Sequence, residues 1–196
     1  MLRKDFRMLK LEYLFENYEL AREALALWEH DEDNLEEMLG YFRISSNAVY
    51  PFTREGRVCF LRLAPVGEKA ETDVRGELEF IRYLLKEGYP ALRPVCSLSG
   101  EDMVVADTGF GRYFACVFEK VDGVEISEAG YGREVMYAYG RALGRLHALS
   151  SGYVPAVRKQ GHKEILEWIR RTLEEYGGCR EALTELAAVE RELGRL

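Results

Sequence analysis

The spacing of apolar and polar residues changes twice along the chain. Residues 8–28 carry apolar side chains at helical spacing, which predicts an amphipathic helix packed on whatever follows it. Between residues 41 and 119, short runs rich in β-branched and aromatic residues are separated by turn signals, which is typical of strands. Helical spacing returns at residue 133. The pattern therefore predicts an α+β chain with helices at both ends and strands between them.

Two turn signals divide the start of the strand region, Ser-Ser-Asn at 45–47 and Glu-Gly at 55–56. They predict three consecutive antiparallel strands at about 41–45, 48–53 and 57–63. Further apolar runs separated by a Ser-Gly turn and a Thr-Gly-Phe-Gly turn predict a second set, giving five or six strands in all. This second set is expected at 94–98, 103–106 and 113–119.

Side chains alternate between the two faces of a strand, and both faces of the strand at 57–63 are largely apolar. We therefore expect one face of the sheet to be covered and the other to line a cleft. Arg62 is the exception, on the same face as Val58 and Phe60. A guanidinium at the end of an apolar strand could reach a phosphate or a carboxylate. The alternative is that Arg62 extends to solvent.

The segment from Asp73 to Gly88 predicts a helix, with Asp73 as its N-cap and Gly88 as its C-terminal stop. Glu77 lies one turn before Ile81, beside the apolar stripe of this helix. A carboxylate near a packed face needs a partner, and an arginine on the neighbouring sheet would serve. Arg62 and Glu77 are therefore a candidate ion pair.

Three helices are expected in the last third of the chain, at 133–149, 163–176 and 180–196. Gly140 and Gly144 are four residues apart in the first of them, so another element could approach that side closely. The last repeats apolar residues at alternating steps of four and three, a coiled-coil-like seam too short to hold a dimer by itself. An ordinary core-facing helix is the alternative.

Composition limits the classes of function. A net charge of -7 argues against a general nucleic-acid binder, which needs a basic face. No apolar run reaches the roughly 18 residues that would span a bilayer, and the charged N-terminus has no signal-peptide core. We therefore expect a cytoplasmic protein with no membrane partner. The four cysteines, Cys59, Cys96, Cys116 and Cys179, form no CxxC pair, which favours free thiols. Cys59 and Cys116 lie within apolar strand-like runs and are expected to be buried.

Three further features carry alternative chemistry. The run 30–33, His-Asp-Glu-Asp, could hold a metal, but a solvated loop in which Asp33 or Asn34 caps a short helix is favoured. His147 could act as a base, although a hydrogen bond to a backbone carbonyl is favoured. The Gly-Phe-Gly at 109–111 lacks the third glycine and the helix start of a phosphate-binding loop, so a hairpin turn is favoured.

The stretch from about residue 40 to 152 resembles the N-terminal part of the aminoglycoside phosphotransferase and choline kinase group, within the kinase-like superfamily. The resemblance rests on the order and spacing of several motifs rather than on any one of them. They are NAVYPF after a polar turn, LRL at a strand end, GELEFIRYLLKEG, the strand leading to FEKVDG, and GRALGRLHALS.

This resemblance implies a fold and a division of the chain. An N-terminal helical segment at 1–38 would precede a kinase-like N-lobe at 39–122, built from an antiparallel sheet of five or six strands plus one helix and ending in a hinge. A partial helical C-lobe without the catalytic loop would follow at 123–196.

The resemblance also implies an ATP site between the sheet and the hinge. A cation held by an acidic residue of the helix would touch the phosphates, and backbone groups of the hinge would bind adenine whatever their side chains are. The implied residues are Ser45, Ser46 and Asn47 over the triphosphate, Arg62 at the phosphates with Glu77 as its partner, Phe60 above adenine, Phe118 as gatekeeper, and the Glu119 carbonyl and Val121 amide as adenine hydrogen-bonding groups.

The sequence departs from the family in the motifs that perform the chemistry. It has no His-x-Asp triplet, and Asp107-Thr108-Gly109 lies in a predicted hairpin. We therefore assign no catalytic or metal-binding residue, expect Mg²⁺ only in a longer protein, and expect the chain to end before its catalytic half. Phosphoryl transfer needs metal ions and a positioned base, so this polypeptide is expected to be inactive by itself.

Two hypotheses follow. The chain could be the ATP-binding part of a kinase that transfers the γ-phosphate to a hydroxyl of an aminoglycoside-like, choline-like or other small polar substrate. It could instead be a noncatalytic nucleotide-binding or interaction module, complete at 196 residues, that forms a homo-oligomer through uncovered C-terminal helices. A metal-dependent hydrolase built on His30 or His147 has little support.

Overall fold

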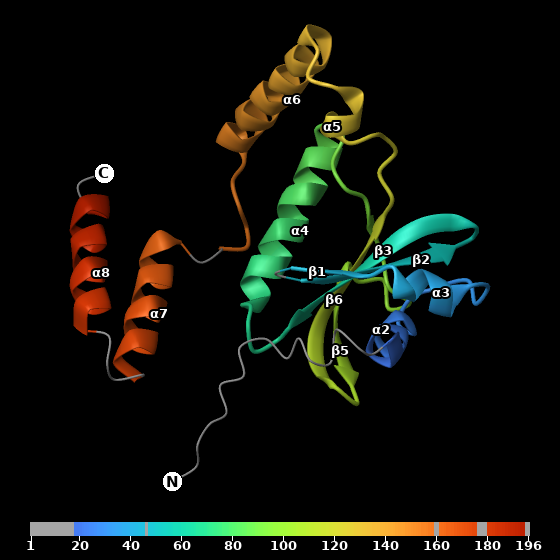
Figure 1. Ribbon diagram of the computed structural model, residues 1–196, viewed down its shortest axis with the longest axis horizontal. Helices are drawn as coiled ribbons and strands as arrows, with labels where there is room; N and C mark the ends of the chain where they lie inside the picture. The colour runs from blue at the N-terminus through green and yellow to red at the C-terminus, as the bar shows by residue number, and fades with distance from the viewer. Residues whose placement is uncertain (1–17, 46, 159–160, 176–179, 195–196) are drawn as a thin grey trace. The chain divides into compact units, whose positions relative to one another are not determined.

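The computed structural model describes residues 18–45, 47–158, 161–175 and 180–194. The chain forms two compact units, Met1–Val157 and Arg158–Leu196. The first contains the sheet and most of the helices, and the second contains two helices (Figure 1). The predicted boundaries after residues 38 and 122 divide the chain by expected role and remain predictions.

The sheet has six antiparallel strands, which confirms the predicted fold class and strand number. Its order is β1-β2-β3-β6-β4, and β5 also pairs with β6. Two strands are shorter than predicted, because only two residues of each find partners. The strands are β1 (Arg43–Ile44), β2 (Ala48–Arg54), β3 (Arg57–Pro65), β4 (Pro94–Val95), β5 (Met103–Thr108) and β6 (Gly111–Glu119).

The β2–β3 turn is held from outside the sheet. Glu55 and Gly56 both have left-handed backbone angles, with φ of 52° and 71°, a conformation that costs a residue with a side chain more than it costs glycine. The Asp31 carboxylate accepts the backbone N–H groups of Glu55 at 2.9 Å and of Gly56 at 2.8 Å. The Gly56 bond, chiefly, lowers the pKa of Asp31. Asp31, in the acidic run at 30–33, therefore holds the β2–β3 turn in place.

One face of the sheet is covered by the N-terminal helices α2 (Tyr18–Leu25) and α3 (Leu35–Gly40). Trp28, just after α2, is buried, and its Nε1 donates to the Val95 carbonyl at 2.9 Å. The part of the predicted first helix before residue 18 lies outside the described residues. At the start of α3, Asn34 occupies the N-cap position, but its side chain makes no capping hydrogen bond, so the expected cap is wrong.

The other face is covered by α4 (Glu71–Lys86), which lies across the sheet from α2 and α3 (Figure 1). Its apolar stripe is buried against this face, so the expected cleft is not open along its whole length. The helix begins at Glu71 with Ala70 at the N-cap, so the prediction that Asp73 is the cap is wrong. Gly88 follows the helix end with φ of 68°, which fits the predicted stop.

After β6 the chain becomes helical, as predicted, with α5 (Ile126–Ala129) and α6 (Arg133–Gly152). No residue of α6 is buried, and Tyr139, on its predicted apolar face, is 56% exposed. An added Cβ at Gly140 or Gly144 would meet no described atom within 4 Å. The close approach that these glycines allow is therefore not used by the described part of the chain.

The second unit contains α7 (His162–Glu175) and α8 (Arg180–Leu193), which pack on each other. Leu186 of α8 is buried, and an Arg170–Glu190 ion pair joins the two helices. The last predicted seam position, residue 196, lies outside the described residues. Both helices lie where the spacing predicted them, and Ile165 and Trp168 of α7 are 45% and 65% exposed.

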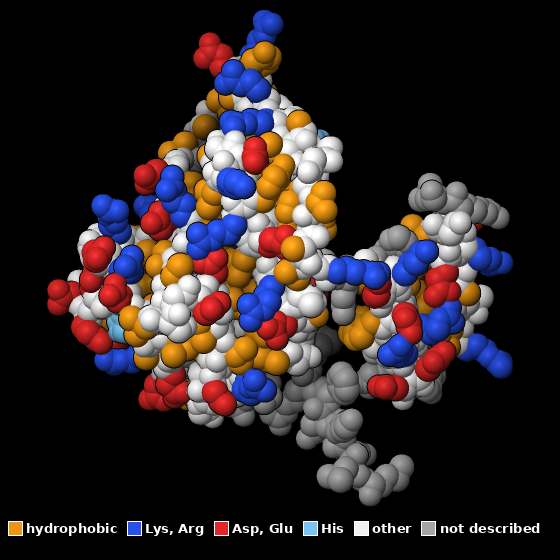
Figure 2. All heavy atoms as spheres, turned by 180° about the vertical axis from the view of Figure 1, so that it is seen from behind, with side chains coloured by type: hydrophobic (Ala, Val, Ile, Leu, Met, Phe, Trp, Pro, Cys, Tyr) orange, Lys and Arg blue, Asp and Glu red, His pale blue; other side chains and the backbone are white. Residues whose placement is uncertain are grey.

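The cysteines within the described residues are free, with Cys59 and Cys116 buried and Cys96 exposed. Cys179 lies outside the described residues. Among the helices that the structure describes, none combines the length and the apolar character that a membrane crossing requires. On the face shown in Figure 2, Lys and Arg side chains are interspersed with Asp and Glu.

Candidate functional site

An ion pair joins β3 to α4, where the sequence predicted it. The Arg62 Nη1 donates to the Glu77 Oε1 at 2.6 Å, and the two side chains are 17% and 38% exposed. Strand alternation turns Arg62 towards α4, and helical spacing places Glu77 beside the packed stripe. Burial opposes the charge of Arg62, but the hydrogen bond that Arg62 donates to Glu77 helps to raise the pKa of Arg62 above its ordinary value. Arg62 is therefore a fixed cation.

The floor beneath this cation is aromatic and apolar. The Arg62 guanidinium carbon lies 5.0 Å from the centre of the Phe118 ring, within the range of a cation–π interaction. Cys116, also on β6, is buried, and burial raises the pKa of its thiol to about 11, against the opposing effect of Arg62. The thiol is therefore neutral at physiological pH, and Glu77 supplies the compensating charge.

A second cation lies close to the first. The Lys69 Nζ donates to the Asn47 Oδ1 at 2.6 Å, which joins the β3–α4 loop to the turn before β2. Burial and then the charge of Arg62 lower the pKa of Lys69. Sequence reasoning missed this residue, because a lysine in a polar loop has no periodicity that marks it. The structure therefore adds Lys69 to the predicted residues.

The end of β6 and the connector that follows it, residues 120–125, are bonded to chain segments on both sides. The Glu119 amide donates to the Arg93 carbonyl at 2.9 Å, and the Lys120 amide donates to the Val58 carbonyl at 3.1 Å. Phe60 and Phe118 are paired across β3 and β6, Phe60 half-buried and Phe118 buried. Val121, beyond the strand end, is 62% exposed. The aromatic pair and the exposed connector backbone therefore adjoin one another.

The predicted site residues are brought together unevenly. Arg62 contacts both Glu77 and Phe118. Asn47 binds Lys69, whose charge interacts with those of Arg62 and Glu77. Ser45 is exposed in the same turn, its amide donating to the Asn47 carbonyl at 2.9 Å. Ser46 lies outside the described residues. The role of each residue in ligand binding remains a prediction.

The other candidate sites of the sequence analysis were a metal site at 30–33, a base at His147 and a phosphate-binding loop at 109–111. Among the described residues, no cluster of three or more His, Cys, Asp or Glu side chains could hold a metal ion. His147 is exposed on α6. The segment 109–111 forms the predicted β5–β6 hairpin, with Thr108 and Gly111 paired and the Gly109 amide donating to the Glu23 Oε2 at 2.8 Å.

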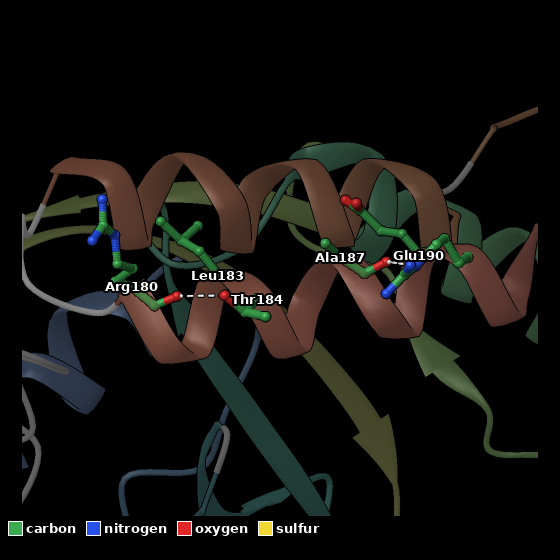
Figure 3. Close-up of a pocket in the computed structure, with 6 residues that line it drawn as sticks. Arg180, Leu183, Thr184, Ala187 and Glu190 are labelled. Carbon is green, nitrogen blue, oxygen red and sulfur yellow. Dashed lines mark hydrogen bonds between the residues drawn. The ribbon is translucent and has the colours of Figure 1, made fainter.

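Neither of two hollows in the described surface is lined by Arg62, Glu77 or Lys69, although Glu119 lines the second. One of about 710 Å³ runs along α8 (Figure 3), where Thr184 and Arg191 bond carbonyls of their own helix. The other, about 440 Å³, lies between the β2–β3 turn and the connector, from Arg54 to Asp122. The residues that line the first hollow all belong to α8, so no side chains from different elements meet there. The second hollow is lined by the β2–β3 turn and by residues at the end of β6 and just after it.

The sheet, the helix that covers its second face, the strand–helix ion pair and the connector after the last strand are the parts that the resemblance to kinases implied. A model of the phosphotransferase enzyme family (APH) matches residues 43–195. The chain belongs to this family. Amicoumacin kinase of Bacillus subtilis (strain 168) is 25% identical over 151 residues, which are 75% of this chain and 44% of that protein.

Solved structures show the same fold. The amicoumacin kinase hAmiN, in complex with AMP-PNP, Ca²⁺ and Ami, matches with a TM-score of 0.72 and 23% identity, over 95% of this chain and 56% of that one. A microcompartment-associated aminopropanol kinase matches with a TM-score of 0.57 and 20% identity, over 73% and 44%. The chain thus spans about half the length of the relatives that it matches.

Proposed function

We propose that this chain is the ATP-binding part of a small-molecule phosphotransferase. The observation that carries the proposal is the Arg62–Glu77 ion pair, set beside the Lys69–Asn47 hydrogen bond at the turn before β2. Two cations this close repel each other, and an anionic ligand between them relieves that repulsion. A nucleotide triphosphate is such a ligand. Arg62 and Lys69 would hold its phosphates, with the 45–47 turn above them.

Adenine would lie at the connector end of the same face. Phe60 and Phe118 offer an apolar surface there. The backbone groups of Glu119 and Val121 lie at the end of β6 and just beyond it, two residues apart. The Glu119 carbonyl would accept the adenine amino group, and the Val121 amide would donate to a ring nitrogen. That the solved relative of this fold binds AMP-PNP supports a nucleotide in this position.

The proposed reaction transfers the γ-phosphate to a hydroxyl of an aminoglycoside-like, choline-like or similar small polar substrate. The relatives are named as kinases of amicoumacin and aminopropanol, which supports a small molecule as acceptor. The acidic net charge is compatible with cationic acceptors. Mg²⁺ would neutralise the phosphates, with the ligands supplied by a longer protein. The proposed location is the cytoplasm, where free thiols stay reduced.

These 196 residues, taken alone, are proposed to bind ATP without transferring phosphate, since they contain no His-x-Asp triplet. The second candidate function is a noncatalytic nucleotide-binding module that self-associates. It is favoured by the large apolar side chains that α6 exposes, which are Met136, Tyr137, Tyr139 and Leu143. Native mass measured across a concentration series separates the two, because only the second requires an oligomer.

Substitution of Arg62 tests the ATP site. Arg62→Ala should weaken ATP binding by about tenfold or more, since a charge-assisted contact is worth about 1.5–3 kcal/mol. Titration calorimetry measures the affinity, and circular dichroism checks that the sheet is intact. Arg57→Ala, exposed at the other end of β3, is the charge-matched control. Equal affinity in Arg62→Ala and wild type would refute the role of Arg62.

Lys69 provides a finer test of where the phosphates lie. Lys69→Met keeps the length of the side chain and removes its charge. If Lys69 faces the outer phosphates, this variant should lose affinity for ATP and retain affinity for AMP. An equal loss for both nucleotides would place Lys69 elsewhere.

A further inference from the structure

The C-terminal end of α4 is held by polar contacts from α6. The Arg145 guanidinium donates to the Glu87 carbonyl at 3.1 Å and to the Gly88 carbonyl at 3.0 Å. It also lies 5.9 Å from the centre of the Tyr89 ring. Carbonyls at a helix C-terminus lack intrahelical donors and carry partial negative charge, so a guanidinium is a favourable partner there.

Two tyrosines add bonds in the opposite direction. The Tyr83 hydroxyl, on α4, donates to the Leu149 carbonyl of α6 at 3.0 Å. The Tyr89 hydroxyl donates to the Ala142 carbonyl at 3.4 Å. These bonds lie along α6 on both sides of Arg145, so the helix is fixed to α4 although none of its own side chains is buried.

The segment after α6 returns to the middle of α4. The Glu79 carboxylate accepts the amides of Ala156 at 2.7 Å and Val157 at 2.8 Å. These two bonds lower the pKa of Glu79, so it stays ionised at neutral pH. The Tyr153 ring packs beside them, with its centre 4.9 Å from that of Phe80 and 5.0 Å from that of Tyr83.

We propose that these contacts form a clamp that positions Glu77 for Arg62, with Arg145 and Glu79 as its positioning residues. The clamp comprises the α4 contacts of Arg145, Glu79 and Tyr83. The inference rests on the proposed nucleotide function, because the ion pair that it serves is the proposed phosphate site. It extends that function by assigning a role to residues that do not touch the site.

The geometry of α4 makes this coupling direct. Glu77 and Glu79 are two residues apart, about 200° around the helix, so they face opposite sides. The apolar stripe packs α4 closely on the sheet, and the Arg82–Asp102 ion pair adds one polar attachment there. The opposite side of the helix does not face the sheet, so its polar contacts decide how exactly the rotation and axial position of α4 are held. Directional hydrogen bonds at Glu79, Tyr83 and the last carbonyls restrain α4 from that side. The carboxylate of Glu77 is thereby held at the guanidinium.

ATP affinity measured by calorimetry tests the clamp. Arg145→Ala should weaken ATP binding by about three- to tenfold, and Arg145→Lys should recover part of the loss. Arg141→Ala, one turn earlier on α6, is the charge-matched control, because the Arg141 side chain makes no hydrogen bond or ion pair with another described residue. It should bind as wild type does. Unchanged affinity in Arg145→Ala would overturn the clamp.

A double-mutant cycle separates positioning from general stabilisation. If Arg145 acts through Glu77, then Arg145→Ala should have little further effect on affinity in a Glu77→Gln background. A full-size effect in that background would overturn the proposal. Wild-type binding and Arg62→Ala test the proposed function itself, whereas the Arg145 variants and this coupling test the clamp, so the two fail in distinguishable ways.

Hydrogen exchange gives a readout that needs no nucleotide. Arg145→Ala should speed the exchange of α4 amides along the whole helix, including the turns around Glu77. Acceleration confined to the last turn would show only a lost helix cap, and would overturn the clamp. Glu79→Ala, which acts from the middle of the helix, should give the same extended pattern.

Discussion

The two faces of the sheet differ in what packs against them. The face towards α2 and α3 is apolar, and Leu61 and Leu63 of β3 are completely buried there. The face towards α4 carries the Arg62–Glu77 pair and the Cys116 thiol among its apolar residues. Both faces use the same two central strands. Neighbouring residues of β3 therefore belong to different environments.

The difference shows how one strand can carry both stability and binding. Leu61 and Arg62 are adjacent in sequence and on opposite faces, so the apolar face can stay close-packed while the other holds charge. A charge buried in the core between the sheet and the helices α2 and α3 would have to be paired or neutralised. On the second face Glu77 provides that partner, and the half-buried Phe60 leaves one end accessible.

The largest effect on stability is expected in the apolar core between the sheet and the helices α2 and α3. Leu61→Ala should lower the free energy of unfolding by about 2–5 kcal/mol, because a fully buried leucine leaves a cavity when truncated. Urea denaturation measures the loss. The ATP affinity of the remaining folded protein should stay within about twofold of wild type, which is about 0.4 kcal/mol. The reason is that Leu61 lies on the opposite face of the sheet from Arg62. A large loss of affinity with little loss of stability would contradict the division between faces.

Glu77→Gln should have the opposite profile. It removes the counter-charge of Arg62 while keeping the side-chain length, so Arg62 loses its anchor and ATP affinity should fall about tenfold. The loss of stability should be smaller than that of Leu61→Ala, because Glu77 is 38% exposed. Calorimetry and denaturation on the same sample give both values. Tighter ATP binding would show that Glu77 competes with the nucleotide instead of orienting Arg62.

The Arg82–Asp102 pair tests whether every charge on α4 serves binding. Arg82 Nε donates to Asp102 Oδ2 at 2.7 Å, and this hydrogen bonding lowers the pKa of Asp102. A depressed carboxylate pKa adds stability above the unfolded-state value of about 3.9, and that stability is lost as the pH falls through the folded-state value.

Asp102→Asn should therefore cost about 0.5–1 kcal/mol at neutral pH. The difference from wild type should shrink below about pH 4. Denaturation midpoints measured between pH 7 and 3 follow this. ATP affinity at pH 7 should stay within about twofold of wild type, because the clamp contacts of Arg145, Glu79 and Tyr83 still hold α4 in this variant. A difference that persists at pH 3 would refute the assigned cause.

The smallest effect is expected from a pair with the same bond length. Arg75 Nε lies 2.6 Å from Glu71 Oε1, as close as the Arg62–Glu77 contact, but both side chains are about half exposed. Arg75→Ala should change stability by only about 0.3–0.5 kcal/mol and leave ATP affinity unchanged. Calorimetry and denaturation check both. An affinity loss comparable to that of Glu77→Gln would mean that burial does not decide which pair matters.

The sequence predicts the parts of this fold that depend on local pattern. Alternation along β3 correctly separates Leu61 from Arg62, and helical spacing brings Glu77 to Arg62. Strand ends were less accurate, since β1 and β4 contain only the residues that find partners in space. The pattern places the N-cap at Asp73, but α4 starts at Glu71 with Ala70 as its N-cap. An acidic residue such as Asp73 is also favourable within the first turn.

Contacts between distant segments could not be predicted. Asp31 binds a turn 24 residues away, and Lys69 reaches Asn47 across 22 residues. Neither residue has a spacing that marks its partner. The contacts of α6 with α4 were missed for the same reason, because they use backbone carbonyls, which have no sequence signature.

The bond from Trp28 to Val95 also affects how the molecule can associate. β4 is a two-residue strand at one end of the strand order, and such a strand presents unpaired backbone groups to any extended chain. Here the indole occupies the Val95 carbonyl, and the Leu98 amide donates to the Leu27 carbonyl at 2.9 Å. A strand from another molecule would have to displace both bonds. The segment just after α2 therefore also protects this edge against strand addition and aggregation.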